Sequence, residues 1–253
     1  MNSTYNRAIL ALALLLLVPA SLWAQKTQRG ARTRSAQTPP AKTAPRTTPA
    51  APQPQGVNLS AQDLALLIEE LGVPPQARAQ LASNEASRKE FVQDLREMFA
   101  VAEEARAAGL AERPEVKLQL ELSRTFVIAR RYSKQRQAAG ATSPDQVVSA
   151  AEIDAFIKEA GQDQKFQEFF QDYLKSRPKA EQANTVTDEQ RENLRQQWAN
   201  IILSARKGVA AGVDKERATV VMVMYQRARL LAGEYFKQTL DARTKATDAE
   251  LEA

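Results

Sequence analysis

The sequence predicts an all-α fold, a multi-helix bundle with a duplicated helical hairpin, and two observations lead to this prediction. From Asn58 onward the apolar residues recur at spacings of three and four, and no stretch alternates as a strand would. In addition, one segment of 55 residues occurs twice, and both copies have the pattern of two helices with a glycine turn between them. We expect the bundle to be preceded by a signal peptide and a disordered linker.

Residues 1–24 have the features of a secretory signal peptide. Met1–Arg7 is a short polar stretch with one cation, and Ala8–Val18 supplies eleven uninterrupted apolar residues. Small residues allow cleavage after Ala24 or Ala20. The apolar run is shorter than the roughly 20 residues that span a bilayer, and the alternative to cleavage is an uncleaved N-terminal anchor. In both cases the body of the chain leaves the cytoplasm, and we expect a periplasmic protein.

Residues 25–55 are predicted to be a disordered, basic, Pro-rich linker. They contain six prolines and no large apolar residue, so burial cannot offset the entropy of ordering them. Seven cations and no acid precede Gln55 in a chain of net charge +5, so the remainder carries −2. A nucleic-acid reader would place its cations on the folded part, so we expect no nucleic-acid partner. The linker is expected to act as a spacer, with contact to an anionic membrane surface as the alternative.

The sequence contains no cysteine and no histidine. Disulfides, a lipidated cysteine and thiolate metal sites are therefore excluded. Without histidine the chain also lacks the usual general base near neutral pH and the commonest metal ligand. We expect no catalytic residues, no metal site, no bound cofactor and no enzymatic activity of its own.

Residues 56–176 are predicted to form one helical domain. Ser60 and Asp63 are placed to cap a first helix, and Pro74-Pro75 can open a short second one. A third helix is expected from near Asn84 to the glycine at position 109. After it, a long helix from Pro114 to about residue 137 is apolar on more than one face, so we expect it at the centre of the bundle.

The rest of this first domain is expected to contain another helix and an aromatic stripe. Ser149 and Glu152 form a capping box that opens the helix. The stripe follows at helical spacing over Phe166–Tyr173.

Residues 177–253 are predicted to be a second helical repeat, packed on the first domain. Shifting the sequence by 103 positions aligns residues 84–138 with 187–241 without a gap, and eleven of the 55 positions are identical. Both copies contain Ala-Ala-Gly at the end of their first helix. Both are followed by a capping box, and the second box, Thr247 with Glu250, predicts a new helix from about Asp248. Such a short helix needs a neighbour to dock on, or else the reading frame is cut short.

Part of the chain resembles the N-terminal helical domain of SurA and related parvulin-type peptidyl-prolyl isomerases. The resemblance extends from Ser60 to about Tyr173 and recurs weakly to the last residue. Its pattern is carried by Ala102–Lys117, Leu120, Arg124, Ala129, Tyr132 and Ser149–Phe156.

The resemblance implies an ATP-independent chaperone that binds unfolded or outer-membrane client proteins. In the family a separate parvulin domain isomerises X-Pro bonds, but this sequence has no histidine, no Gly-Gly pair and no strand pattern. Isomerase residues therefore transfer to no position here. The alternatives are a truncated or non-catalytic relative of the isomerases and a structural or adaptor protein of the envelope. The sequence leaves the client, the groove residues and the oligomeric state open.

Two apolar stretches, Val220–Met224 and Phe166–Tyr173, lie either in a binding groove or in the hydrophobic core. Val220–Met224 is a soft apolar cluster that could line an adaptable groove. The alternative for this cluster, and for the stripe Phe166–Tyr173, is a place in the hydrophobic core. The acid pairs Glu69/Glu70 and Glu103/Glu104 are expected on solvated helix faces, because helix neighbours point about 100° apart and do not share a site.

Overall fold

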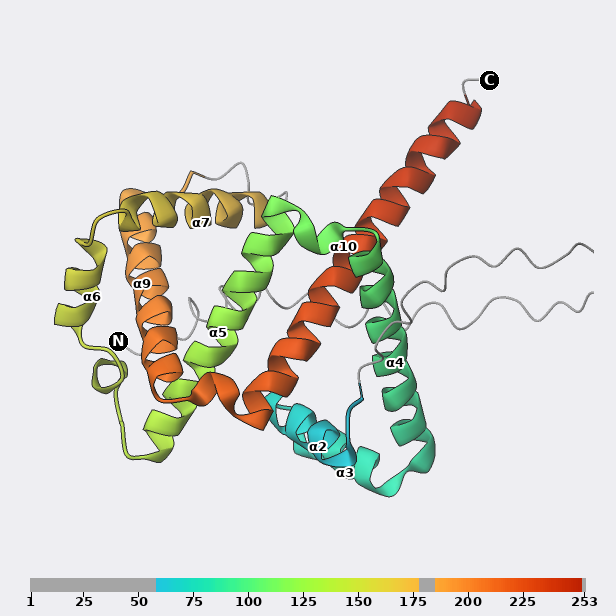
Figure 1. The fold of residues 1–253 in the computed structure, drawn as a ribbon, viewed down its shortest axis with the longest axis horizontal. Coiled ribbons are helices and arrows are strands. Elements are labelled where there is room, and N and C mark those ends of the chain that lie inside the picture. Colours follow the sequence, from blue (N-terminus) through green and yellow to red (C-terminus); the bar gives the residue numbers. More distant parts are fainter. Residues whose placement is uncertain (1–57, 178–184, 252–253) are drawn as a thin grey trace, which may run out of the picture.

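The computed structural model of this chain describes residues 58–177 and 185–251, and all regular structure in those ranges is helical (Figure 1). The described residues form eight α-helices and three short 3-10 helices, with no strand among them. The prediction of an all-α protein is confirmed. The predicted signal peptide (residues 1–24) and linker (residues 25–55) lie outside the described residues.

The first two described helices begin at the predicted capping residues. Helix α2 (Ala61–Glu70) starts after Ser60, whose hydroxyl oxygen accepts a hydrogen bond from the backbone N–H of Asp63. The Asp63 carboxylate in turn accepts the backbone N–H of Ser60 at 2.9 Å, which completes a capping box. Helix α3 (Pro75–Ser83) opens with proline at its first position, where the missing N–H has no partner to lose.

Two helix–turn–helix units have the same bounds when one is shifted by 103 residues. The first unit consists of α4 (Glu85–Ala107), η2 (Leu110–Glu112) and the start of α5 (Pro114–Ala138). The second consists of α9 (Asp188–Ala210), η4 (Val213–Lys215) and the start of α10 (Arg217–Leu251). Each turn depends on a glycine with left-handed backbone dihedrals, at φ 75° in Gly109 and φ 77° in Gly212.

A smaller group of helices connects the two units. It comprises η3 (Pro144–Gln146), α6 (Ala150–Ile157) and α7 (Gln162–Ser176). Helix α6 begins at the predicted capping box, in which the Ser149 hydroxyl and the Glu152 carboxylate bond each other's backbone N–H groups.

The predicted helix start near Asp248 is wrong. Helix α10 runs without a break from Arg217 to Leu251 and includes the Thr247–Glu250 sequence in its last turns. A capping sequence starts a new helix only where the preceding helix has ended. Residues 217–251 contain no proline and a single glycine, Gly233, so they contain no strong helix-ending residue before Thr247. The end of α10 extends beyond the rest of the fold in Figure 1.

The helices of each unit pack mainly on the other unit. Among the described elements, α4 lies along α10, α5 lies along α9, and α5 crosses α10 between these two pairs (Figure 1). This differs from the closed hairpin that the sequence pattern suggests, because α5 carries apolar residues on two faces and needs a partner on each. The central position predicted for α5 is confirmed by its contacts with both α9 and α10.

Two hydrophobic cores lie on either side of this crossing. The first is formed by α2, α4, η2, α5 and α10, and its largest buried side chains include Leu67, Leu95, Met98, Leu110, Val116, Val127, Val221, Met222 and Leu231. The second is formed by the connecting helices and α9, with Val147, Val148, Ile153, Phe156, Phe166, Phe170, Leu194 and Trp198. Ile128, Ala129 and Ala205 form a third, smaller cluster at the α5–α9 contact.

The contact between α5 and α9 is unusually close at Gly208. A Cβ atom placed on this glycine would lie 2.8 Å from Ile128 Cγ2 and 3.2 Å from Tyr132 Cβ. The position shifted by 103 residues, Ala105, carries a methyl group and is fully buried against the first core. The α5–α9 pair is therefore packed too closely for a side chain that the α4–α10 pair accommodates.

Candidate binding pocket

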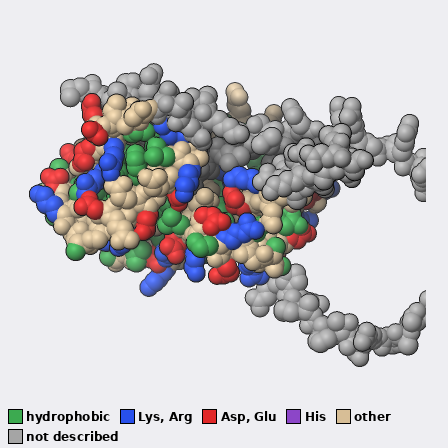
Figure 2. Space-filling view, turned by 90° about the horizontal axis from the view of Figure 1, so that it is seen from above, with side chains coloured by type: hydrophobic (Ala, Val, Ile, Leu, Met, Phe, Trp, Pro, Cys, Tyr) green, Lys and Arg blue, Asp and Glu red, His purple; other side chains and the backbone are tan. Residues whose placement is uncertain are grey.

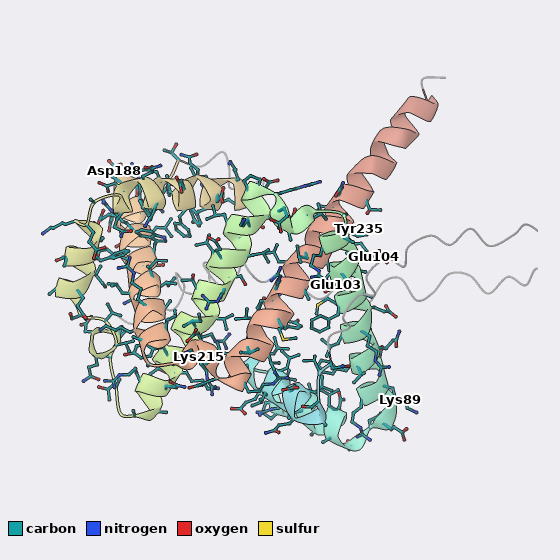
Figure 3. The ribbon with its side chains drawn as sticks, in the orientation of Figure 1. Lys89, Glu103, Glu104, Asp188, Lys215 and Tyr235 are labelled. Carbon is teal, nitrogen blue, oxygen red and sulfur yellow. The ribbon has the colours of Figure 1, made fainter. Side chains whose placement is uncertain are left out.

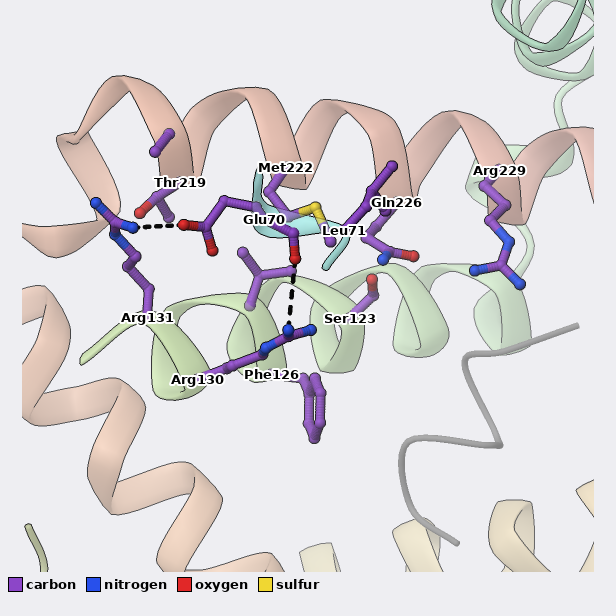
Figure 4. A pocket seen from close by; sticks show the side chains of 12 residues that line it. Glu70, Leu71, Ser123, Phe126, Arg130, Arg131, Thr219, Met222, Gln226 and Arg229 are labelled. Carbon is purple, nitrogen blue, oxygen red and sulfur yellow. Dashed lines mark hydrogen bonds and ion pairs between the residues drawn. The ribbon is translucent and has the colours of Figure 1, made fainter. Parts of the chain in front are cut away.

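A pocket lies between the C-terminal end of α2 and the crossing of α5 and α10 (Figure 4). Its volume is about 100 Å³, and twelve side chains line it. Helix α2 contributes Glu70 and the residue after it, Leu71, and α5 and α10 supply the other ten. Because the two long helices belong to different units, the pocket exists only when both units are folded together.

The floor of the pocket is apolar. Val127, Ala218 and Met222 are each less than 8% exposed and belong to the first core or to the helix turn beside it. Met222 adds a flexible thioether, a side chain that adapts to irregular apolar partners. Phe126, which is half-buried, lines the pocket on the α5 side. A floor of this kind is suited to an apolar group of a ligand.

The α2 wall of the pocket is fixed by ion pairs. The Glu70 carboxylate, which is only 9% exposed, contacts Arg131 Nη1 at 2.5 Å and Lys134 Nζ at 3.0 Å. Arg131 also contacts Glu216 at 3.2 Å, so one guanidinium bridges α2 and the start of α10. Arg130 Nη2 donates a longer hydrogen bond of 3.4 Å to the backbone oxygen of Glu70. These bonds hold the end of α2 against α5.

The other end of α2 is anchored to α10 by a buried carboxylate. Arg217 binds Asp63 through two nitrogens, Nε at 2.6 Å and Nη2 at 2.7 Å. The Arg217 guanidinium first, and the hydrogen bond from the Ser60 backbone second, hold the pKa of Asp63 far below its usual range. The carboxylate thus caps α2 and pairs with α10 at the same time.

The mouth of the pocket is polar and carries mostly positive charge. Arg130, Arg131 and Arg229 line it, while Glu70 is the single acid among the described lining residues. Figure 4 shows the side chains of Ser123 and Gln226 between those of Arg130 and Arg229. The pocket therefore combines an apolar floor with a cationic, hydrogen-bonding mouth.

One polar atom of the pocket lining, the Thr219 hydroxyl oxygen, lacks a hydrogen-bond partner among the described residues. Thr219 is 1% exposed, and its hydroxyl oxygen makes no hydrogen bond within the described part of the chain. A buried hydroxyl without a partner is unfavourable, because it loses its bond to water and gains none. A bound molecule or water could satisfy this group.

The structure places the apolar cluster Val220–Met224 mostly in the core. Val221 and Met222 are buried in the first core, while Val220, Val223 and Met224 are half-buried. Of these five, only Met222 lines the described pocket. One member of the stretch therefore lines the pocket, and the main role of the stretch is packing.

The aromatic stripe Phe166–Tyr173 lies in and beside the second core. Phe166 and Phe170 are buried, and Phe166 and Phe169 both lie within 6.4 Å of the Trp198 ring, measured between centroids. The guanidinium of Arg191 lies 5.3 Å from the centre of the Phe170 ring. For the buried rings the expected alternative, a place in the core, is confirmed.

The acid pairs behave differently from each other. Glu104 is exposed on α4, as expected for a solvated face, whereas Glu103 is half-buried and accepts two hydrogen bonds from Arg106 (both acids are labelled in Figure 3). Glu70 departs from that expectation, because it is nearly buried. Lys134 Nζ lies 3.6 Å from Glu69 and 3.0 Å from Glu70, so these neighbours do share a partner. A long lysine side chain from another helix can reach between carboxylates that point apart.

Few features of the sequence point to the charged pocket residues. Arg130 and Arg131 are adjacent cations directly after the apolar run Phe126–Ala129, which is a detectable signal, but Glu70 lies 60 positions before Arg130 in the chain. Ser123 and Thr219 are small hydroxyl residues within helices and have no distinguishing pattern. Their common pocket depends on how α5 crosses α10.

Neither a metal cluster nor a membrane-crossing helix is found in the described ranges 58–177 and 185–251. No three acidic residues there are grouped so as to hold a metal ion. No helix in those ranges is both long and apolar enough to span a bilayer. Figure 2 shows acidic and basic side chains interspersed over one face of the described molecule.

Comparison with known proteins gives no relative. No protein-family model, no curated protein and no solved structure matches this chain.

Proposed function

We propose that this chain is an exported, ATP-independent chaperone-like protein that binds unfolded or extended segments of envelope proteins in the periplasm. The single observation that supports this most is the pocket between α2, α5 and α10, with its apolar floor and polar mouth. The resemblance of residues 102–132 to the helical part of SurA-type foldases points to the same activity. A pocket for one side chain would hold a client weakly and release it without an energy source.

We also propose that the two helix–turn–helix units are copies of one ancestral hairpin. Eleven identical positions in 55 and matching helix bounds support this origin. A duplication would account for the way each unit finds its packing partners in the other. The binding pocket would then be a product of the duplication, since it lies where the second helices of the two units cross.

The location and the N-terminal segments belong to the same proposal. Residues 1–24 direct export as a signal peptide, and residues 25–55 act as a basic, Pro-rich spacer between the helical part and its surroundings. Contact of this spacer with an anionic membrane surface is a further part of the proposal. Deleting residues 25–55 should release the protein from the envelope fraction if that contact retains it.

The proposal is tested by aggregation of a client protein, followed by light scattering. The chain from Gln25 at an equimolar ratio should suppress scattering of a reduced or heat-treated client. Gln226→Trp, which fills the mouth of the pocket, should weaken the protection. Gln238→Trp is the matched control, because Gln238 is exposed on the same helix and lies outside the pocket. No protection by the unmodified chain would contradict the proposal.

Peptidyl-prolyl isomerisation is the second candidate function, because part of the chain resembles the family of parvulin-type isomerases. The rate of X-Pro isomerisation in a standard peptide should therefore be measured on the same sample. Acceleration would favour a relative of the isomerases that acts without the family's catalytic domain. Neither protection nor acceleration would favour a structural or adaptor protein of the envelope.

A further inference from the structure

We propose that the pocket between α2, α5 and α10 binds the carboxyl terminus of a polypeptide. The last side chain, an aliphatic one, would lie on the apolar floor, and the terminal carboxylate would lie at the mouth. This inference rests on the proposed function, because it names the part of a client that the pocket takes.

The size of the pocket selects the apolar group. An apolar cavity of about 150 Å³ takes one benzene molecule, so the volume here of about 100 Å³ admits one aliphatic side chain. A long acyl chain does not fit in this volume. Val127, Ala218 and Met222 offer the group an apolar surface that is largely removed from water.

The charge at the mouth selects the carboxylate. Three arginines line the pocket, and the one described acid among the lining residues, Glu70, already contacts Arg131 at 2.5 Å and Lys134 at 3.0 Å. The lining is therefore net positive. Arg130 is exposed and is held at the mouth by its 3.4 Å bond to the Glu70 backbone oxygen. Guanidinium groups bind carboxylates through paired N–H donors.

Two neutral polar groups of the lining, one of them buried, suit the end of a peptide. The Ser123 hydroxyl can donate to a carboxylate oxygen, and the Gln226 amide can both donate to and accept from the last peptide group. Both side chains lie between Arg130 and Arg229 in Figure 4. A free amino acid or a fatty acid contains no peptide group, so it would offer the Gln226 amide no such hydrogen-bond partner.

The test compares two versions of one peptide by fluorescence anisotropy. The probe is a dye-labelled, unstructured decapeptide that ends in leucine, with either a free carboxylate or a carboxamide. The chain from Gln25 should bind the acid about tenfold more tightly than the amide, because charge-assisted bonds to arginine are lost in the amide. Equal affinity for the two peptides would overturn the inference.

Variants locate the preference in the pocket. Arg130→Gln should reduce the preference for the acid about fivefold, a modest factor because Arg130 is exposed to solvent. Arg136→Gln, an exposed position on the same helix outside the pocket, should leave it unchanged. A preference that survives Arg130→Gln in full would overturn the inference.

The results of the aggregation assay and of the peptide-binding assay together separate this inference from the proposed function. If client aggregation is suppressed but acid and amide bind equally, the chaperone function stands and the carboxylate site fails. If the acid is preferred but aggregation is not suppressed, the site stands and the chaperone function fails. Displacement of the peptide by sodium octanoate at equal concentration would show that any carboxylate suffices, which overturns the assignment to a polypeptide end.

Discussion

Replacing Gly208 by alanine should destabilise the protein, although the same change in an open helix stabilises it. Alanine is favoured over glycine within a helix by about 1 kcal/mol. At Gly208 the new methyl group would lie 2.8 Å from Ile128 Cγ2. Ile128 cannot turn this methyl group away, because a β-branched residue in a helix is confined to essentially one χ1 rotamer. Forcing an extra carbon into a packed contact typically costs about 1–3 kcal/mol.

The net effect is therefore a loss of about 1 kcal/mol in the free energy of unfolding. Gly233→Ala is the matched control, because Gly233 is also within a long helix, is exposed, and has no described atom within 4 Å of a built Cβ. That variant should gain up to about 1 kcal/mol. The difference between the two variants, about 2 kcal/mol, is the quantity that the structure predicts.

Urea unfolding followed by far-UV circular dichroism at 25 °C measures both variants under the same conditions. A change in midpoint with an unchanged slope reports stability alone. The double variant Ile128→Ala/Gly208→Ala adds a thermodynamic cycle, in which the cost of the new methyl group should fall, while its 3.2 Å contact with Tyr132 Cβ remains. If Gly208→Ala proves as stabilising as Gly233→Ala, then α5 and α9 do not approach each other as described.

Three other predictions concern the ion pairs and the second core. Because the Arg217 pair holds the pKa of Asp63 far below its usual range, Asp63 stabilises the fold above about pH 4 and loses this effect as the pH falls; Asp63→Asn should reduce the difference in urea midpoint between pH 7 and pH 3. Lys207 and the capping bond from Ser149 lower the pKa of Glu152 to about 2, so Lys207→Met should make the midpoint less sensitive to acid over the same range. Trp198→Ala should cost about 3–5 kcal/mol, and because α5 is shared by both cores, tyrosine fluorescence and circular dichroism should still show one transition.

The helices could largely be predicted from the sequence, because their signals are local. Capping residues Ser60 and Ser149, the proline at position 114 and the glycine turns each act within a few residues, and α2, α6 and α5 begin where these signals lie. The failure at Asp248 shows the limit of a local signal, since a capping sequence does not by itself interrupt a helix that is otherwise continuous.

The pocket could not be predicted in the same way, because it depends on which helices meet. The close approach of α5 and α9 requires Gly208, but a glycine within a helix pattern has no unique meaning. Glu70 looked like a surface acid, and only the crossing of the long helices brings Arg131 and Lys134 to it. Met222 alone was identified among the pocket residues, because its apolar neighbours drew attention to that stretch.

The exchange of packing partners between the two units has a consequence for the order of events during synthesis of the chain. Helix α4 packs on α10, which begins 132 positions after it, and α5 packs on α9, which begins 74 positions after it. Contacts that close such long loops form slowly and leave apolar surface uncovered in the meantime. A chain emerging from its N-terminus would expose the apolar faces of α4 and α5 until the second unit arrives, and two chains at that stage could complete each other.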